Sequence, residues 1–113
     1  MSVQGMNHFT VLSDDLETTR KFYCDLLGFE VGDQPILHVI HRNQLQEHRA
    51  GVIDHMAFSA SGLKATLAAL DARRIEYVCR QQKGTGTWQV FVHDPNGAKV
   101  ELDFDADEPA PAR

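Results

Sequence analysis

The feature that most constrains the fold of this chain is a repeat of its own sequence at an offset of 47 residues. Residues 7–31 align with residues 54–78 without a gap, and each copy opens around a histidine, His8 in the first and His55 in the second. Three further identities follow: Leu16 with Leu63, Thr19 with Thr66 and Val31 with Val78. Two similar segments are expected to fold into the same supersecondary unit. The repeat predicts two modules, over about residues 6–41 and 52–104, within a single domain of residues 1–113.

The first module has the pattern of a strand, a helix and two short strands. Residues 6–12 alternate in polarity, which places His8 and Thr10 on one face of a strand. Residues 13–15 offer N-cap oxygens, apolar residues then recur at helical spacing, and Gly28 supplies the stop. Strands are expected at residues 29–31 and 36–41, and the polar stretch over residues 42–50 is expected to be a surface connection.

The second module repeats this plan with clearer strands. A strand over residues 52–59 precedes a helix whose apolar face is formed by Leu63, Leu67 and Leu70. The later strands are expected at residues 75–78, 87–93 and 99–104, the last two joined by a turn at residues 94–97. This order predicts an α+β fold of two β-α-β-β-β modules. Residues 105–113 are expected to form a flexible tail with nothing to pack against.

The two modules differ in length. His38 in the first matches Glu101 in the second, because each is a polar residue between apolar neighbours in a strand. Thirty residues separate His8 from His38, whereas 46 separate His55 from Glu101, a difference of 16. The first module is therefore expected to be shortened after Gly32. Two explanations are open: the first module lacks a hairpin, or residues are missing from the sequence at this point.

Composition argues against several classes of function. The chain carries 16 acidic and 11 basic residues, a formal net charge of −5, so no basic surface for nucleic acid is expected. The first residues do not resemble a leader, and no apolar run reaches the roughly 18 residues of a membrane span. A cytoplasmic protein without a membrane partner is expected. Cys24 and Cys79 lack metal or redox spacing and are expected to be small buried residues.

Two histidines and one glutamate form the strongest candidate site. His8 and His55 occupy equivalent repeat positions, and Glu101 stands in an alternating strand near the end of the second module. Imidazoles and a carboxylate are common ligands of divalent metals that keep open coordination positions. The alternative, for any one of these residues alone, is a half-buried side chain that hydrogen-bonds a carbonyl or a backbone group. The other histidines lie in or beside polar connections and are expected to be solvated: His41, His48 and His93.

Several local motifs resemble the vicinal oxygen chelate superfamily, which includes glyoxalase I, fosfomycin-resistance thiol transferases, extradiol dioxygenases, methylmalonyl-CoA epimerase and bleomycin-binding proteins. In the family's order, the motifs are Asn7-His8-Phe9-Thr10, the helix end from Phe22 to Phe29, Asp54-His55-Met56-Ala57-Phe58, and Phe91-Val92-His93-Asp94-Pro95-Asn96-Gly97 leading to Val100-Glu101-Leu102. Together they cover residues 6–104. The resemblance implies that the strands curl into a cupped mixed sheet with the helices outside and a metal between the two halves.

The resemblance also assigns roles to individual residues. It implies that His8, His55 and Glu101 bind a divalent metal ion, and it places His38 where some members carry a fourth ligand. Ligation, substrate contact and simple packing all stay open for His38. For substrate binding it favours Gln89, whose face would look toward the metal, although core packing of that face is the alternative. Thr10 lies on the face of His8 and can hydrogen-bond a bound oxyanion.

The implied function is that of a metal-dependent enzyme acting on an oxygen-rich small molecule. A glyoxalase-like lyase or isomerase would use Zn, Ni, Co or Mn to stabilise negative charge, with Glu101 or a metal-bound hydroxide as the base. One alternative is an extradiol-type dioxygenase, in which the same three ligands hold Fe(II). Another is a metal-free binding or resistance protein. A fosfomycin thiol transferase is less favoured, because Arg113 is the only basic residue after Phe104. A homodimer is expected, as for many family members of this length.

Overall fold

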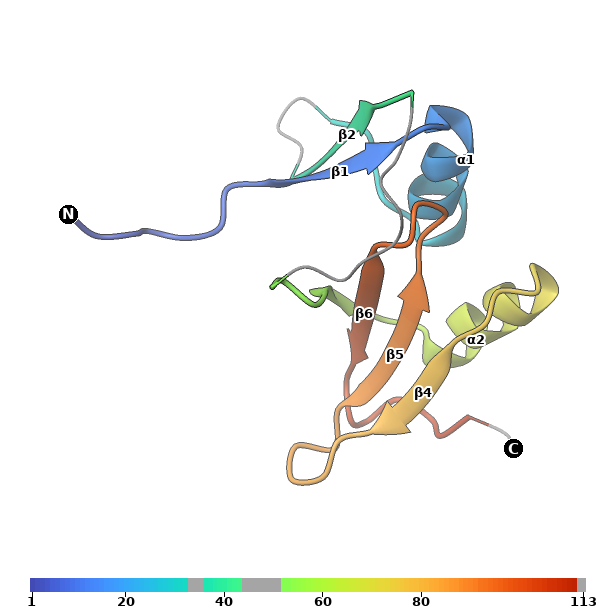
Figure 1. The fold of residues 1–113 in the computed structure, drawn as a ribbon. Coiled ribbons are helices and arrows are strands. Elements are labelled where there is room, and N and C mark those ends of the chain that lie inside the picture. Colours follow the sequence, from blue (N-terminus) through green and yellow to red (C-terminus); the bar gives the residue numbers. More distant parts are fainter. Residues whose placement is uncertain (33–35, 44–51, 112–113) are drawn as a thin grey trace. The chain divides into compact units, whose positions relative to one another are not determined.

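The computed structural model of the chain describes residues 1–32, 36–43 and 52–111. The chain divides into two compact units, Met1–Glu47 and His48–Arg113, and each unit is described by itself (Figure 1). The surface connection predicted over residues 42–50 lies mostly outside the described residues. No helix within the described ranges combines the length and the apolar character that a bilayer crossing requires.

The first unit contains β1 (Phe9–Ser13), α1 (Leu16–Arg20), the π-helical segment η1 (Lys21–Leu26) and β2 (Leu37–His41). α1 begins where the Asp15 side chain accepts a hydrogen bond from the Thr18 backbone N–H at 3.1 Å. η1 continues the helix, and the chain leaves it at Gly28, whose φ of +78° favours glycine. The helix predicted between residues 13–15 and Gly28 is confirmed, although its second half is π-helical.

The strand predicted at residues 29–31 is wrong, because Phe29 completes the helix end instead. Its backbone N–H donates to the Tyr23 carbonyl at 2.8 Å, and its ring meets the Tyr23 ring edge-on with centroids 5.3 Å apart. Val31 is 88% exposed. With only one apolar side chain half-buried, the segment lacks the alternating face that stabilises a strand.

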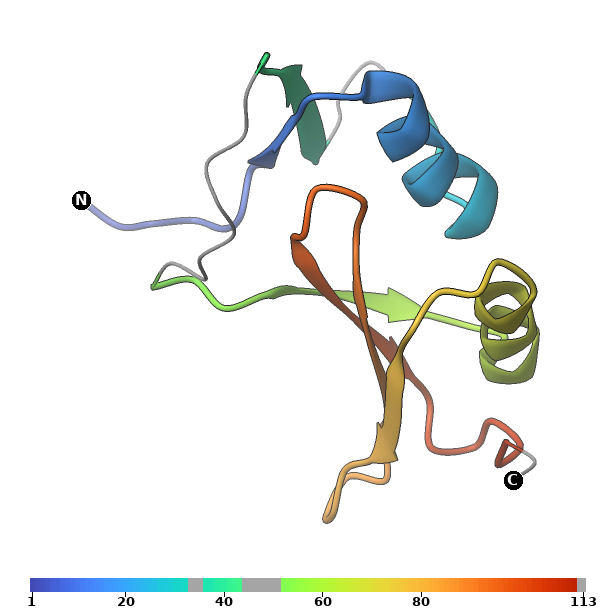
Figure 2. The same cartoon turned by 45° about the vertical axis from the view of Figure 1, so that its right-hand side comes forward.

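The second unit contains β3 (Met56–Ala60), α2 (Leu63–Ala72), β4 (Val78–Gln81), β5 (Trp88–His93) and β6 (Lys99–Phe104). These strands form one sheet in the order β3-β6-β5-β4, in which β3 and β6 are parallel and the other pairs are antiparallel. β3 runs directly into α2 (Figure 2). The strand predicted at residues 75–78 begins only at Val78, because the Ile75 N–H donates to the Leu70 carbonyl at 3.0 Å and still belongs to the helix exit.

The predicted hairpin over residues 87–104 is confirmed, and one side chain closes its turn. Asp94 is buried, and its Oδ1 accepts hydrogen bonds from the backbone N–H groups of Asn96 and Ala98, both at 2.8 Å. Gly97 has a φ of +93°, a conformation that strongly favours glycine. The turn thereby sets the register in which Phe91 faces Glu101 and Gln89 faces Asp103.

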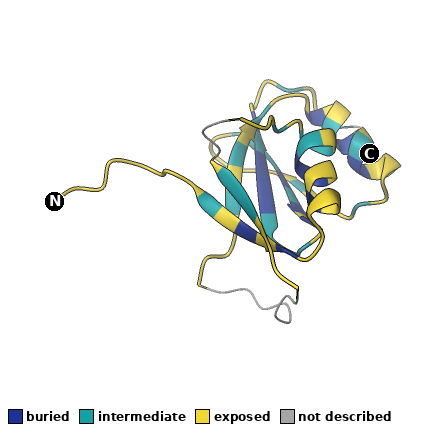
Figure 3. Ribbon diagram, turned by 90° about the horizontal axis from the view of Figure 1, so that it is seen from above, coloured by how far each residue is buried: buried dark blue, intermediate teal, exposed yellow. Residues whose placement is uncertain are grey.

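The buried apolar side chains are unevenly divided between the units. Those of the second unit lie on α2, β5 and β6, as the dark blue segments of Figure 3 indicate: Leu63, Leu67, Leu70, Val90, Val92, Val100, Leu102 and Phe104. Those of the first unit are Val11, Phe22 and Tyr23. Because side chains alternate along a strand, the core face of β5 and β6 leaves Gln89, Phe91 and Glu101 on the opposite face.

The sheet registers confirm the repeat. β1 pairs with β2 in parallel and sets Thr10 opposite His38, just as β3 pairs with β6 in parallel and sets Ala57 opposite Glu101. Because the offset of 47 carries Thr10 onto Ala57, His38 and Glu101 are structural equivalents. The described part of the first unit contains two strands against four in the second, so the first module is shortened as expected.

Within the segment predicted to be a flexible tail, Glu108 contacts the start of α2. α2 starts at Gly62, which has no side chain for capping. The Glu108 carboxylate takes this role and accepts hydrogen bonds from the N–H groups of Gly62 at 2.9 Å and Leu63 at 3.1 Å. In the first unit, Asp15 caps α1 from the position that immediately precedes the helix. In the second unit, the capping residue Glu108 lies 45 residues after Leu63, the first residue of α2.

Candidate metal and substrate site

His8 and His38 lie together in the first unit. His8 immediately precedes β1 and is exposed, while His38 is half-buried in β2 opposite Thr10. The two imidazole rings stack with centroids 4.3 Å apart and planes inclined by 16°. Thr10 is two residues after His8 and shares the face of both histidines. The structure therefore brings together the three residues that were predicted for the site in the first module.

The stack limits what His38 can do together with His8. A metal ion bound by imidazole lies in the plane of the ring, along the lone pair of its nitrogen. Two nearly parallel planes with centroids 4.3 Å apart meet only well beyond bonding distance. In the stacked arrangement, His8 and His38 therefore cannot both bind the same ion, and His38 has to turn out of the stack to become a ligand.

The orientation of His8 is fixed by its neighbour. Its Nδ1 lies 2.6 Å from Oδ1 of Asn7. An amide oxygen only accepts hydrogen bonds, so Nδ1 is assigned the proton in this contact. Nε2 then retains its lone pair, which is the state of a histidine prepared for metal binding.

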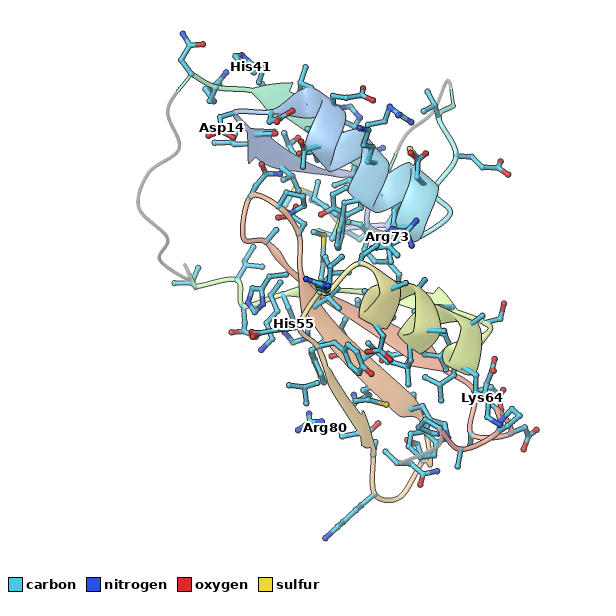
Figure 4. The ribbon with its side chains drawn as sticks, turned by 90° about the vertical axis from the view of Figure 1, so that its right-hand side faces the viewer. Asp14, His41, His55, Lys64, Arg73 and Arg80 are labelled. Carbon is cyan, nitrogen blue, oxygen red and sulfur yellow. The ribbon has the colours of Figure 1, made fainter. Side chains whose placement is uncertain are left out.

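His55 and Glu101 form the corresponding pair in the second unit. His55 immediately precedes β3, and its Nε2 lies 3.1 Å from Oε1 of Glu101 in β6. The Glu101 side chain is 9% exposed and that of His55 35% exposed. In Figure 4, His55 lies on the side of the sheet away from Lys64, which marks the start of α2. The pair thus lies on the face opposite the apolar core.

Asp54 holds His55 as Asn7 holds His8. Oδ2 of Asp54 is 2.7 Å from Nδ1 of His55 and 3.3 Å from Nζ of Lys99. The hydrogen bond with His55, and next the contact with Lys99, lower the pKa of Asp54. The ionised carboxylate only accepts, so Nδ1 of His55 carries the proton in this contact.

This arrangement tests whether a metal ion fits between His55 and Glu101. With Nδ1 protonated, the lone pair of Nε2 faces a carboxylate oxygen at 3.1 Å, which is favourable only with a proton or a metal ion between them. Two ligand atoms that bind one Zn²⁺ at about 2.1 Å and at roughly 90–110° lie roughly 3.0–3.4 Å apart. The separation and the chemistry of the two donors therefore fit a divalent metal.

Each unit contains two candidate ligands, although only His55 and Glu101 have a separation that fits one shared ion. His8 and His55 both immediately precede the first strand of their module, and His38 and Glu101 occupy equivalent positions in the last strand. The described residues contain no group of three or more His, Cys, Asp or Glu side chains close enough to hold one ion.

Gln89 lies behind Glu101. Its Nε2 donates to Oε2 of Glu101 at 3.4 Å, and its Oε1 accepts from Nε of Arg80 at 3.1 Å. Val90 and Val92 on the other face of β5 are completely buried. The face of β5 that carries Gln89 and Phe91 is therefore the face next to His55 and Glu101.

A hollow of about 910 Å³ adjoins the His55–Glu101 pair. This volume is within the range of small-molecule sites, roughly 300–1,000 Å³. All of its lining residues belong to the second unit: Asp54, His55, Asp71, Ile75, Glu76, Tyr77, Val78, Arg80, Phe91, His93, Lys99 and Glu101. His93, expected only to be solvated, is exposed and lines this hollow, while His41 is exposed at the end of β2 and His48 lies outside the described residues.

The two cysteines have no part in this site. Cys24 and Cys79 are both free thiols and both half-buried. Burial raises the pKa of the Cys79 thiol, which disfavours the reactive thiolate.

Comparison with known proteins establishes the family. The family model described as Glyoxalase/Bleomycin resistance protein/Dioxygenase superfamily matches residues 5–102. The chain belongs to this superfamily. Among solved structures, a glyoxalase/dioxygenase from Nostoc punctiforme has a TM-score of 0.73 at 19% identity and covers 90% of this chain and 91% of its own. No curated protein matches the sequence.

Two further solved structures share the fold. A genomically encoded fosfomycin resistance protein from Listeria monocytogenes has a TM-score of 0.70 at 17% identity, with 91% of this chain and 94% of that chain covered. A glyoxalase family protein from Enterococcus faecalis has a TM-score of 0.67 at 22% identity, with 88% and 97% covered. These likenesses confirm the superfamily fold that the motifs predicted.

Sequence reasoning missed several residues around the candidate site of this superfamily member. Asp54 was recognisable, because it precedes His55 as Asn7 precedes His8. Asp103 follows Glu101 by two residues on the same face, and burial, together with the neighbouring Glu101, raises the pKa of Asp103 to about 6. Arg80 gave no signal, because the strand that carries it was predicted to end at Val78.

Proposed function

We propose that this protein is a divalent-metal-dependent enzyme of the glyoxalase type, a lyase or isomerase, in which His8, His55 and Glu101 bind the metal. The observation that carries the proposal is the His55–Glu101 pair, in which Nε2 of His55 lies 3.1 Å from Oε1 of Glu101 while Oδ2 of Asp54 contacts Nδ1 of the histidine. His8 has the same backing from Asn7 and the equivalent place in the repeat. His38 is the fourth ligand of the proposal, after it turns out of its stack with His8.

The bound metal would supply Lewis acidity toward two neighbouring oxygens of a small substrate. The chain's own residues prepare for this in three ways. Asn7 and Asp54 each engage Nδ1 of the following histidine, so that Nε2 is the nitrogen that would bind the metal. Gln89 steadies Oε2 of Glu101 and lies on the substrate side, while Thr10 offers a hydroxyl on the face of His8. Such outer contacts orient ligands and raise their basicity.

Proton transfer next to a carbonyl needs a base, and Glu101 takes this role in the proposal. Its carboxylate is buried, and its two oxygens have different neighbours, His55 at Oε1 and Gln89 at Oε2. The Gln89 contact is long, at 3.4 Å, and the side chain of Asp103 also contacts Glu101, so a substrate proton taken up by Glu101 has a second acidic group beside it.

The His8–His38 stack favours a second candidate function. If His38 stays in the stack, the remaining ligands are two histidines and one carboxylate, the facial triad of non-heme Fe(II) oxygenases. The chain would then be an extradiol-type dioxygenase. Turnover of a 2-oxoaldehyde–thiol adduct without oxygen supports the glyoxalase type, and oxygen uptake with a catechol and Fe²⁺ supports the dioxygenase.

The proposal includes a small-molecule substrate, a homodimer and a cytoplasmic location. The hollow beside Glu101 supports the first, since its volume of about 910 Å³ suits a small ligand. The family supports the second, which light scattering of the purified protein would test.

Metal analysis tests the site directly. The parent protein, incubated in turn with Zn²⁺, Ni²⁺, Co²⁺, Mn²⁺ and Fe²⁺ and then freed of excess metal, is expected to retain about one ion per chain. His8→Ala, His55→Ala and Glu101→Ala should lose it, and His41→Ala, an exposed histidine of the same sheet as His38, should retain it. His38→Ala separates the two candidates, because only a four-ligand centre weakens.

Unchanged metal content in all three ligand variants would overturn the proposal. A parent protein that takes up none of the five ions would overturn it as well, and would favour a metal-free binding or resistance protein instead.

A further inference from the structure

The ring of Phe91 lines the hollow beside the His55–Glu101 pair, and metal binding does not explain its presence there. Phe91 lies opposite Glu101 on one side of β5 and opposite Val78 on the other. The His55 ring meets the Phe91 ring nearly perpendicularly, with centroids 6.1 Å apart. Val78 is 60% exposed on the same face. An apolar surface thus begins next to the candidate ligands and continues across β5 to β4.

Two cations border the ring of Phe91. Cζ of Arg80 is 5.0 Å and Nζ of Lys99 is 5.3 Å from its centroid, distances typical of cation–π contacts. Arg80 lies opposite Gln89 and Lys99 lies opposite His93 in the sheet, so the two cations approach from opposite ends of the strand. Figure 4 places Arg80 on the same side of the sheet as His55.

The two cations differ in the ion pairs and hydrogen bonds that they already form. Lys99 forms an ion pair with Asp54 at 3.3 Å. Within the described residues, Arg80 donates only through Nε, to Gln89 at 3.1 Å, and no carboxylate there lies within ion-pair distance of it. Its two Nη groups have no hydrogen-bond acceptor among these residues. The ring of Phe91 and the amide of Gln89 hold the guanidinium in place. Ligand binding therefore costs little additional side-chain entropy of Arg80.

A guanidinium with two free Nη groups is suited to one kind of ligand group. Its planar donors match a carboxylate in two parallel hydrogen bonds and also grip phosphonate or phosphate oxygens. The chain as a whole repels anions, since its formal net charge is −5. Four carboxylates also line the hollow: Asp54, Asp71, Glu76 and Glu101. An anion that binds here therefore has to be held by direct contacts with Arg80 rather than by the electrostatic field.

We propose that this hollow binds a small organic anion, with its oxyanion on Arg80 and its apolar body over Val78 and beside Phe91. The inference rests on the proposed function in one respect: the far end of the same molecule would present its oxygens to the metal at His55 and Glu101. Both His55 and Arg80 lie close to the ring of Phe91, at 6.1 and 5.0 Å, so one small molecule lying beside that ring reaches both. The substrate class is thus an acid with an apolar centre and a second, chelating group of oxygens.

Anion binding is tested on the full chain after metal removal with a chelator, so that it is measured independently of the metal site. Titration of ¹⁵N-labelled protein with phenylacetate is expected to give saturable shifts of the Arg80 Nε–H signal and of the Phe91 amide. Arg80→Gln should raise the Kd at least about tenfold, because a hydrogen bond to a charged group is lost. Arg73→Gln, at the exposed C-cap of α2, should leave the Kd unchanged.

A comparison within the parent protein covers the case in which Arg80→Gln does not fold. Phenylacetamide, the neutral analogue, should bind at least about tenfold more weakly than phenylacetate. Phenylphosphonate distinguishes the two oxyanions: whichever of phenylphosphonate and phenylacetate binds more tightly identifies the acid group of the natural ligand. Equal Kd values for phenylacetate and phenylacetamide, or for parent and Arg80→Gln, would overturn the inference.

The two proposals fail separately. Loss of metal binding in the ligand variants together with absent anion binding refutes only the anion subsite. Anion binding at Arg80 by a protein whose metal content does not depend on His8, His55 and Glu101 refutes only the metal centre.

Discussion

Glu108 caps α2 with two hydrogen bonds, and from these the loss of stability on its removal can be predicted. Replacing Glu108 by alanine removes the acceptor of the Gly62 and Leu63 N–H groups. Loss of a helix N-cap costs about 0.5–2 kcal/mol, and loss of a negative charge at a helix N-terminus about 0.3–1 kcal/mol. Water replaces part of the cap, because the Gly62 contact is exposed. We expect a net loss of about 1–2 kcal/mol in the free energy of unfolding.

Thermal and urea unfolding followed by circular dichroism measure this loss. For a chain of this length, 1–2 kcal/mol corresponds to a fall in Tm of roughly 4–10 °C. Glu108→Gln keeps one acceptor oxygen but loses the charge, so its loss should be intermediate. Amide hydrogen exchange adds a local measurement, since only the protons of Gly62 and Leu63 and the first turn of α2 should exchange faster.

Asp107→Ala is the matched control, because it removes the same charge from the neighbouring exposed residue, whose carboxylate caps nothing within the described residues. Equal destabilisation by Asp107→Ala and Glu108→Ala would show that charge in the tail, not the cap, is responsible. Unaltered exchange at Gly62 and Leu63 in Glu108→Ala would refute the cap itself.

Three further predictions concern the core, the carboxyl group of Asp103 beside Glu101, and Gln89, which contacts the proposed metal ligand Glu101. Leu70→Ala, at a fully buried position of α2, should cost about 2–5 kcal/mol in urea unfolding, whereas Lys64→Ala on the exposed face should cost little. The pKa of Asp103 is raised from 3.8 to about 6, so the folded metal-free protein binds this proton more tightly than the unfolded chain does. Stability should therefore fall as the pH rises from about 4 through 6, and Asp103→Asn should abolish that part of the fall in a pH series of urea midpoints; an unchanged slope contradicts the assignment. Under the proposed function, Gln89→Ala should weaken metal affinity about 10–100-fold without abolishing binding, as measured by competition with a chelating dye. A fully unchanged affinity would mean that Gln89 does not position Glu101.

The sequence was most informative where a pattern repeated. The offset of 47 residues predicted that His8 and His55 stand in equivalent places, and the parallel registers confirm that His38 and Glu101 do so too. The same hydroxyl contact recurs in both helices, since Thr19 and Thr66 each donate to the carbonyl four residues earlier. Duplicated local contacts of this kind explain why the repeat determined the fold so well.

Prediction failed where long-range contacts decide the outcome. Phe29 has strand propensity, but its packing on Tyr23 keeps it at the helix end. The tail residues after Phe104 have no apolar pattern, yet Glu108 binds the start of a helix 45 residues earlier. Arg80 could not be predicted as a candidate site residue, because its position depends on contacts with Gln89 and Phe91 on the neighbouring strand β5. None of these contacts leaves a periodic signal in the sequence, because each joins single side chains across the fold.

The unequal division of buried apolar side chains has a consequence for how metal and folding are coupled. Among the described residues, the buried apolar side chains of the first unit are Val11, Phe22 and Tyr23, whereas the second unit has eight, so the first gains less from burial. Under the proposed function, the free energy of metal binding by His8 would stabilise mostly the first unit, which gains less stability from apolar burial. A chelator would then act as a selective denaturant of residues 1–47, and native-state proteolysis with and without it would reveal the difference.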